Sequence, residues 1–166
     1  MRAMVRHVPF VRTCYARAVA STGYNLDELA ADWRWFFDPA DYTLLTTSPF
    51  GDLVLRDRSG AICLLDVNFA TIEYATNEGV DLATLFPDAF DDRLASRYRD
   101  AGLVLAEGQC YGFKTPIVTA ESSFGPSNVY VAPLVEYVSF MGDFGRQISD
   151  VEDGQRIRLR VGNLPD

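Results

Sequence analysis

Cys110 lies in the sequence EGQCYGFKTP (residues 107–116), between two glycines and next to an aromatic residue, a setting that a catalytic thiol could occupy. A cysteine nucleophile reacts as its thiolate and usually needs a histidine as its base. The chain has one histidine, His7, close to the N-terminus. Papain-like enzymes have a different order of residues around the cysteine and need a downstream histidine. The sequence therefore favours a structural role for Cys110, with a small thiol hydrolase as the alternative.

The same shortage of histidine argues against other catalytic sites. A Ser-His-Asp triad would again depend on His7, and the sequence has no G-x-S-x-G. Zinc could in principle use the three cysteines and His7, but no two of them have the spacing of metal ligands. Asp91 and Asp92 would diverge by about 100° on a helix and would not converge on one bond or one metal ion. Phosphate-binding glycine motifs are also missing. We expect a non-enzymatic protein with no catalytic residue, metal or cofactor.

The charge of the chain is negative and unevenly distributed. Its net charge is -8 and its pI is about 4.6, so its field repels nucleic acid and anionic lipid and attracts cationic partners. Residues 1–26 carry four arginines and no acid, whereas residues 59–92 contain no Lys or Arg. The acids of this second segment are Asp66, Glu73, Glu78, Asp81, Asp88, Asp91 and Asp92. The segment is either solvated surface or a docking face for a basic protein.

The length and composition suit one compact domain. The chain has 166 residues, of which 48% are apolar, enough for a packed core. No apolar run approaches the roughly 18 residues of a membrane-spanning helix, and the arginines near the start interrupt any signal-peptide core. An odd number of widely spaced cysteines fits reduced thiols. We expect a cytoplasmic protein with a short basic helical segment over 1–24 and a single α+β domain over 25–166.

Two helices are predicted near the start of the chain. Apolar residues at helical spacing predict a short helix over 11–19. A second helix is predicted to begin at Asn25, which can cap it, with Glu28 three positions further on. Its apolar residues form one stripe that stops at Asp38–Pro39: Leu26, Leu29, Ala30, Trp33, Phe36 and Phe37. We expect this stripe to face the core.

Between residues 42 and 76 the pattern changes to four short β-rich runs separated by turn sequences: YTLLTT, DLVLRD, AICLLDV and TIEYAT. Gly60, in the DRSG turn, suits the positive φ of a hairpin. The segment predicts a meander of three or four antiparallel strands. After it, Asp81 is predicted to cap a helical turn that reaches Phe86. A further helix, ended by Gly102, is predicted from apolar residues that recur every four positions: Phe90, Leu94 and Tyr98.

The C-terminal part is predicted to form a strand, a helix and a strand. NVYVA (residues 128–132) has β character, and Pro133 suits the first turn of a helix. One face of that helix is apolar: Leu134, Tyr137, Val138, Met141 and Ile148. Gly142 and Gly145 predict a local break or a close backbone contact in this helix. QRIRLRV (155–161) alternates as an edge strand would. The fold class is therefore α+β, with a central antiparallel β-meander packed with helices.

Aromatic residues are too numerous for one buried face. One predicted helix carries Trp33, Trp35, Phe36 and Phe37, and the segment around Cys110 carries Tyr111 and Phe113. Most of them are expected in the core, and any that reach the surface would suit an interface. Lys114, the single lysine of the sequence, is either a solvated loop charge or a contact to an acidic group.

Three stretches resemble a known bacterial family. They are SPFGDLVLRDRSGAICLLDV, LAEGQCYGFKTP and VEYVSFMGDFGRQISDVEDGQRIRLRV, in this order. In sequence and spacing they are similar to the family that includes the immunity proteins against type VI secretion DNase toxins, over about Trp33 to Val161. Two departures are visible. Thr119–Ala120 stand where the family often has a glycine pair, and the N-terminal segment is shorter and more basic than in larger immunity proteins.

The resemblance implies a structural role for each stretch. Phe50–Asp52 would begin the central hairpin, Gln109–Lys114 would form a loop containing Cys110, and Phe140–Ile148 would form a glycine-interrupted final helix. It also implies a cytoplasmic immunity protein that blocks a cognate basic toxin, a DNase, without binding nucleic acid or membrane. The alternative is a regulatory or scaffold module of the same fold. The residues expected to contact the partner are Asp52, Asp88, Asp91, Asp92, Gln109, Tyr111 and Lys114.

Overall fold

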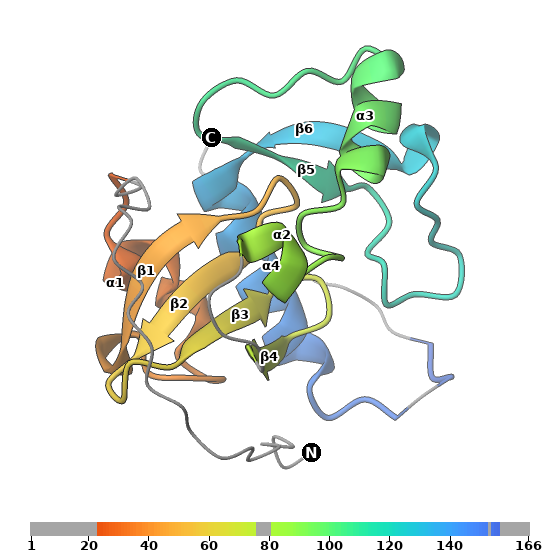
Figure 1. Ribbon diagram of the computed structural model, residues 1–166. Coiled ribbons are helices and arrows are strands. Elements are labelled where there is room, and N and C mark those ends of the chain that lie inside the picture. Colours follow the sequence, from red (N-terminus) through yellow and green to blue (C-terminus); the bar gives the residue numbers. More distant parts are fainter. Residues whose placement is uncertain (1–22, 76–80, 153, 157–166) are drawn as a thin grey trace, which may run out of the picture.

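The computed structural model describes residues 23–75, 81–152 and 154–156 (Figure 1). The helix expected over 11–19 and nearly all of the strand expected over 155–161 lie outside these residues. The helices are α1 (Leu26–Leu29), α2 (Leu82–Leu85), α3 (Asp92–Asp100) and α4 (Leu134–Ile148), with the 3₁₀ turns η1 (Ala31–Trp33), η2 (Pro39–Asp41) and η3 (Pro126–Asn128). The strands are β1 (Tyr42–Thr47), β2 (Leu53–Asp57), β3 (Ile62–Asp66), β4 (Thr71–Tyr74), β5 (Gln109–Phe113) and β6 (Val129–Pro133).

The first four strands form an antiparallel meander in the order β1-β2-β3-β4, as the sequence predicts. The β2–β3 turn has Gly60 at a φ of 91°, and the side chain of Asp57 accepts hydrogen bonds from the amides of Ser59 and Ala61. The edge strand β1 contains a β-bulge, because its register with β2 shifts between Leu44 and Thr46. A bulge of this kind bends and twists the strand locally. The fold class, α+β with a central meander, is confirmed.

The four-stranded sheet has a helix on each face. Successive residues of a strand point to opposite faces, so Leu53 and Leu55 pack with α1 and α4, whereas Val54 packs with α2. β3 alternates in the same way, with Cys63 in the first cluster and Leu64 in the second. Figure 1 shows α2 in front of the sheet and α4 behind it. Burial on both faces explains why these strands have apolar runs instead of simple alternation.

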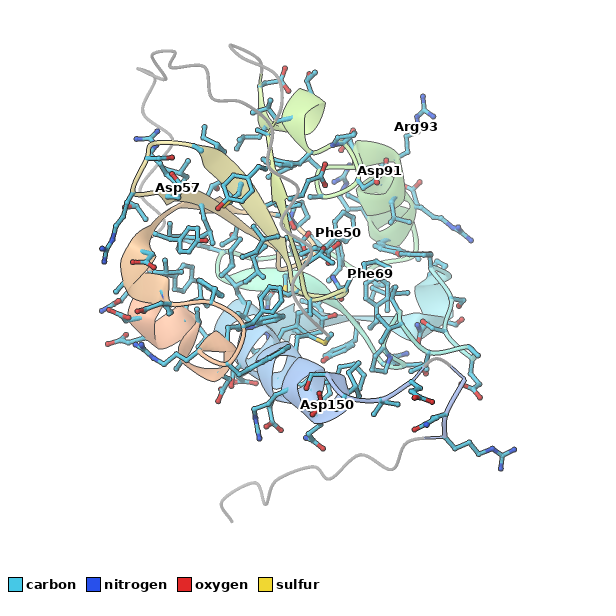
Figure 2. The ribbon with its side chains drawn as sticks, turned by 90° about the horizontal axis from the view of Figure 1, so that it is seen from below. Phe50, Asp57, Phe69, Asp91, Arg93 and Asp150 are labelled. Carbon is cyan, nitrogen blue, oxygen red and sulfur yellow. The ribbon has the colours of Figure 1, made fainter. Side chains whose placement is uncertain are left out.

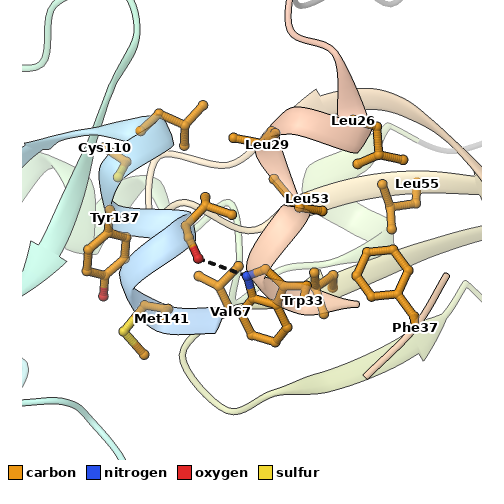
Figure 3. Close-up of a cluster of buried hydrophobic side chains, with 14 of the residues drawn as sticks. Leu26, Leu29, Trp33, Phe37, Leu53, Leu55, Val67, Cys110, Tyr137 and Met141 are labelled. Carbon is orange, nitrogen blue, oxygen red and sulfur yellow. Dashed lines mark hydrogen bonds between the residues drawn. The ribbon is translucent and has the colours of Figure 1, made fainter. Parts of the chain in front are cut away.

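The segment after Asn25 is helical but is not one continuous helix. Asn25 caps α1 by accepting a hydrogen bond from the amide of Asp27, as predicted. The chain then tightens into η1, and the indole of Trp33 donates to the carbonyl of Val138 over 2.8 Å (Figure 3). The indole of Trp35 donates to the carbonyl of Gly142 over 2.9 Å. A regular α-helix would place the two tryptophan side chains about 200° apart around its axis, so they could not both face α4. The change of helical pitch lets both of them reach α4.

The helix α4 is continuous, so the predicted break at Gly142 and Gly145 is wrong and the alternative of a close contact holds. A Cβ atom at Gly142 would lie 2.9 Å from the backbone carbon and oxygen of Asp32 and 2.9 Å from Cδ1 of Trp33. At Gly145 it would lie 3.1 Å from Cζ2 of Trp35. The glycines therefore let η1 and the tryptophans lie directly against the helix backbone.

A second, two-stranded antiparallel sheet pairs β5 with β6, and it includes Cys110. The expected loop over Gln109–Lys114 is therefore wrong, because residues 109–113 form a strand and Cys110 lies opposite Ala132. The strand expected at NVYVA is confirmed as β6. α3 covers this sheet with Ala95 and Tyr98. The helix is capped by Asp91, starts after Phe90, and is followed by Gly102 at a φ of 86°.

The close approach at Gly142 predicts the stability of two alanine variants. Alanine has the better helix propensity by about 1 kcal/mol, yet Gly142→Ala is expected to destabilise the fold by about 1–3 kcal/mol, because the Asp32 backbone cannot move away cheaply. Gly145→Ala, in the same helix, meets only the end of the Trp35 side chain and is the matched control. Urea denaturation measures both. A Gly142→Ala protein at least as stable as Gly145→Ala would contradict the packing.

Candidate functional site

The loop between β1 and β2, Ser48–Asp52, connects the two sheets. The amide of Tyr111 in β5 donates to the carbonyl of Pro49 over 2.8 Å. Inside the loop, the hydroxyl of Ser48 accepts from the amides of Phe50 and Asp52, each over 3.1 Å. Phe50 then packs against the rings of Tyr98 and Tyr111, with centroid distances of 6.3 and 5.9 Å. The loop is therefore a fixed element at the centre of the molecule.

Asp52 is the acid at the end of this loop, and it is 4% exposed. Its carboxyl accepts hydrogen bonds from the Ser48 hydroxyl over 2.7 Å and from the Val67 amide over 3.2 Å. Burial raises the pKa of Asp52 to about 7, and the charge of Asp66 adds to the effect, although the hydrogen bonds oppose it. The expectation that Asp52 contacts a partner does not fit this structure, because its side chain is inside the fold.

A chain of buried polar groups extends from this loop to α4. The hydroxyl of Tyr137 donates to Oδ1 of Asn68 over 2.6 Å, and the amide of Phe113 donates weakly to the same hydroxyl over 3.4 Å. Nδ2 of Asn68 reaches the carbonyl of Phe50 at 3.5 Å. Among the described residues, no buried side-chain nitrogen or oxygen lacks a partner. The network therefore ties the β1–β2 loop, the β3–β4 loop, β5 and α4 together.

The thiol of Cys110 lies beside this network and is fully buried. Burial raises the pKa of Cys110 to about 12, and the charge of Asp52 adds to the shift. A thiol activated for attack has the opposite properties, namely partial exposure and a pKa below the usual 8.5 or so. His7, the base that the thiol-hydrolase alternative requires, lies outside the described residues. The setting of Cys110 therefore argues against this alternative.

Acidic side chains gather on the face of the four-stranded sheet that α2 covers. Asp66 follows Leu64 on the same face of β3, and Glu73 of β4 lies opposite Leu64. Asp88 follows α2, and it is close enough to Asp66 for its charge to act there, as is Glu73. Burial is the main cause of the raised pKa of Asp66, and the charges of Glu73 and Asp88 add to it. We call Asp66, Glu73 and Asp88 the acidic face; Glu73 and Asp88 are exposed.

Asp91 and Asp92 lie at the start of α3, where they already have structural partners. Oδ1 of Asp91 accepts from the amides of Arg93 and Leu94, so Asp91 is the helix cap. Asp92 is exposed and forms an ion pair with Arg99 over 3.1 Å. Figure 2 shows Asp91 and Arg93 together at one end of this helix. Asp91 and Asp92 thus lie next to arginines, whereas Asp88 belongs to the acidic face described above.

The remaining predicted contact residues differ in exposure. Tyr111 is 1% exposed and its hydroxyl donates to the carbonyl of Leu103, so it is part of the core and not a surface contact. Gln109 is half-buried and its side chain accepts from the amide of Ala106 over 2.8 Å. Lys114 is exposed, and its Nζ donates to the carbonyl of Ser127 over 2.8 Å. Of these three, only Lys114 offers a charged group to solvent.

Sequence reasoning did not single out Asp66 and Glu73 as contact residues. They lie on neighbouring strands, and the pairing that brings them together needs the register Leu64↔Glu73. The alternation Ile62, Leu64, Asp66 was the available signal, because it places the acid on a defined face. Phe69, in the β3–β4 loop, was missed too: it is 50% exposed, and its amide donates to Asp66.

No group of three or more His, Cys, Asp or Glu side chains within the described ranges is arranged to hold a metal ion. In the same part of the chain, no helix has the length and apolar character that crossing a membrane requires. Comparisons of the sequence and structure with protein-family models, curated proteins and solved structures find no match. The resemblance to the immunity family therefore stays a prediction.

The buried carboxyl of Asp52 predicts a pH-dependent stability. Its pKa is about 7 in the folded protein against 3.8 for a free side chain. Well below pH 3.8 both states are protonated, and as the pH rises from there towards 7 the unfolded chain loses its proton first, so folding becomes less favourable. Between pH 5 and 8, wild type is expected to lose about 2–3 kcal/mol relative to Asp52→Asn. Urea denaturation at both pH values gives the difference; a constant difference would contradict the raised pKa.

The buried thiol of Cys110 predicts slow alkylation. At pH 8 the native protein is expected to leave Cys110 unmodified by iodoacetamide under conditions that label it fully in urea, because the thiolate is scarce and shielded. Peptide mass spectrometry reads each cysteine separately, and Cys63, equally buried, is the internal control. Fast labelling of Cys110 with an apparent pKa below about 8.5 would restore the thiol-hydrolase alternative.

Proposed function

We propose that this protein is a non-catalytic inhibitor that binds a basic protein toxin, a nuclease, through its acidic face. The observation that carries the proposal is the gathering of Asp66, Glu73 and Asp88 beside α2, within a segment, 59–92, that contains no Lys or Arg. Like charges held close together repel one another, so the face gains from a cationic partner. The exposed ring of Phe69, next to Asp66, adds an apolar contact of the kind that anchors interfaces.

A nuclease is the class of partner that this charge suits. Such an enzyme needs Lys and Arg to hold phosphates, and an acidic inhibitor is drawn to the same residues. Electrostatic steering raises association rates towards about 10⁸ M⁻¹s⁻¹. An antidote benefits from speed, because it must reach the toxin before the toxin reaches DNA. Inhibition would follow from covering the phosphate-binding surface, with no bond made or broken by the inhibitor.

The sequence resemblance described above supports the same proposal from a different direction. The three motifs fall on the β1–β2 loop with β2 and β3, on β5 and on α4, which together surround the buried polar network. The motifs therefore concern the framework of the fold, whereas the acidic face is the evidence for the kind of partner. A toxin as the partner comes from the resemblance, whereas the cytoplasm as the compartment is also expected from the sequence, in which no membrane-spanning run or signal-peptide core was found.

The test is a pair of charge-reversal variants measured against a secreted nuclease, which is first to be sought in the gene neighbourhood of this chain. Glu73→Lys/Asp88→Lys reverses two charges of the acidic face, whereas Glu121→Lys/Asp150→Lys makes the same change at exposed acids elsewhere. The first variant is expected to lower the association rate constant about tenfold and to flatten its salt dependence, because steering acts before contact. It should also lose protection when nuclease and inhibitor are expressed together.

The control variant separates a local surface from overall charge. Equal losses in both variants would mean that only the net charge matters, and would overturn the acidic face as the contact surface. A gene neighbourhood without a secreted nuclease, together with no protection in a killing assay, would overturn the toxin as the partner. In that case a basic non-toxin protein bound through the same residues would fit the regulatory alternative.

A further inference from the structure

A hollow of about 330 Å³ lies at the surface between α4 and the β5–β6 sheet. It is lined by Phe113, Lys114, Tyr130 and Phe140. Phe140 is 41% exposed, and the ring of Phe113 meets that of Phe124, 48% exposed, edge-on at 5.7 Å. The acidic face described above lies on other elements, beside α2. The hollow is thus a separate surface feature with aromatic walls.

Gly112 has no side chain, so the rings of Tyr130 and Tyr137 can lie directly against its backbone. A Cβ atom there would lie 2.8 Å from Cε2 of Tyr137 and 2.9 Å from Cε1 of Tyr130. Tyr130, opposite Gly112 in the sheet, therefore lays its ring across the glycine, and its centroid is 6.4 Å from that of Tyr137. Tyr137 is held by Asn68. The aromatic floor is therefore built on the rigid centre of the molecule.

Lys114 brings a positive charge to the hollow, and the charge of Glu136 reaches Tyr130 on its lining. Lys114 is the single lysine of a chain whose net charge is -8. Its Nζ donates one hydrogen bond, to the Ser127 carbonyl, and an ammonium group has three N–H donors. Its backbone amide is bonded to the Asn128 carbonyl over 2.8 Å, which fixes the base of the side chain. The hollow therefore presents a cation with donors to spare beside aromatic rings.

We propose that this hollow binds the C-terminal residue of a partner chain, with its carboxylate on Lys114 and its apolar side chain among Tyr130, Phe140 and Phe113. A carboxylate complements the ammonium, and an apolar side chain complements the rings. The volume is at the lower end of the range for ligand pockets, about 300–1,000 Å³, so it suits one residue. A single residue that carries both a free carboxylate and an apolar side chain is a C-terminal one.

The test uses three small probes and the full chain, with amide shifts followed by NMR. N-acetylphenylalanine has both groups, its primary amide lacks the charge, and N-acetylaspartate N-methylamide has a side-chain carboxylate without an apolar group. N-acetylphenylalanine is expected to bind with a roughly millimolar Kd, typical of its size, and to shift residues around Lys114 and Phe140. The other two probes are expected to bind at least about fivefold more weakly, because each lacks one of the two contacts.

Matched variants assign each contact. Lys114→Gln keeps a donor and removes the charge, so it should abolish the preference for N-acetylphenylalanine over its amide. Phe140→Ala should weaken both of these probes, whereas Val135→Ala, which shortens another exposed apolar residue of α4, should change neither. Thermal unfolding checks that the variants fold.

Three results would overturn the proposal: equal binding of the acid and its amide, a preference that survives in Lys114→Gln, or equal binding of the aspartate probe. Equal binding of the aspartate probe would mean that the hollow binds any acidic side chain. Since the acidic face takes no part in these measurements, each outcome leaves the charge-reversal test of the nuclease inhibitor as it stands.

Discussion

The hydrogen bond from the Tyr111 amide to the Pro49 carbonyl joins two sheets that share no strand. This hydrogen bond can fix the two sheets relative to each other because the loop that supplies the carbonyl is itself held by hydrogen bonds of Ser48 and of the buried carboxyl of Asp52. The same carboxyl accepts the Val67 amide, so the β3–β4 loop is held at the same point. Desolvating a carboxyl is unfavourable, and at Asp52 this cost is met where three chain segments keep a common geometry.

The arrangement connects the interior to the surface electrostatically. Asp66 stands between the two: its charge raises the pKa of Asp52 inside, and it lies within range of Glu73 and Asp88 outside. The acidic face is therefore attached to the hydrogen-bonded loops around Asp52. A surface held in this way loses little conformational entropy when a partner binds, which would suit the proposed inhibitor.

Much of the frame could be predicted from the sequence, because local rules decide it. Four β-rich runs bounded by turn residues became four strands, and Asn25 caps a helix as its position indicates. Glycine misled at Gly142, which suggested a break although it makes room for backbone from a distant segment. The loop that the resemblance implied over Gln109–Lys114 is a strand, in which Gly112 makes room for two tyrosine rings. The site was only partly foreseen: Asp88 is on the acidic face, but Asp52 and Tyr111 are buried. Burial depends on which segments meet, and a turn sequence does not contain that information.

The bulge in β1 and the exposed carboxylate of Glu73 in β4 lie on the two outermost strands of the meander. An unprotected edge strand invites the backbone of another molecule to pair with it, which is how many sheet proteins aggregate. Distortion at one border and negative charge at the other both discourage such pairing. Pairing of this sheet with the backbone of another chain is thereby disfavoured, which leaves its side chains as the groups that another molecule can meet.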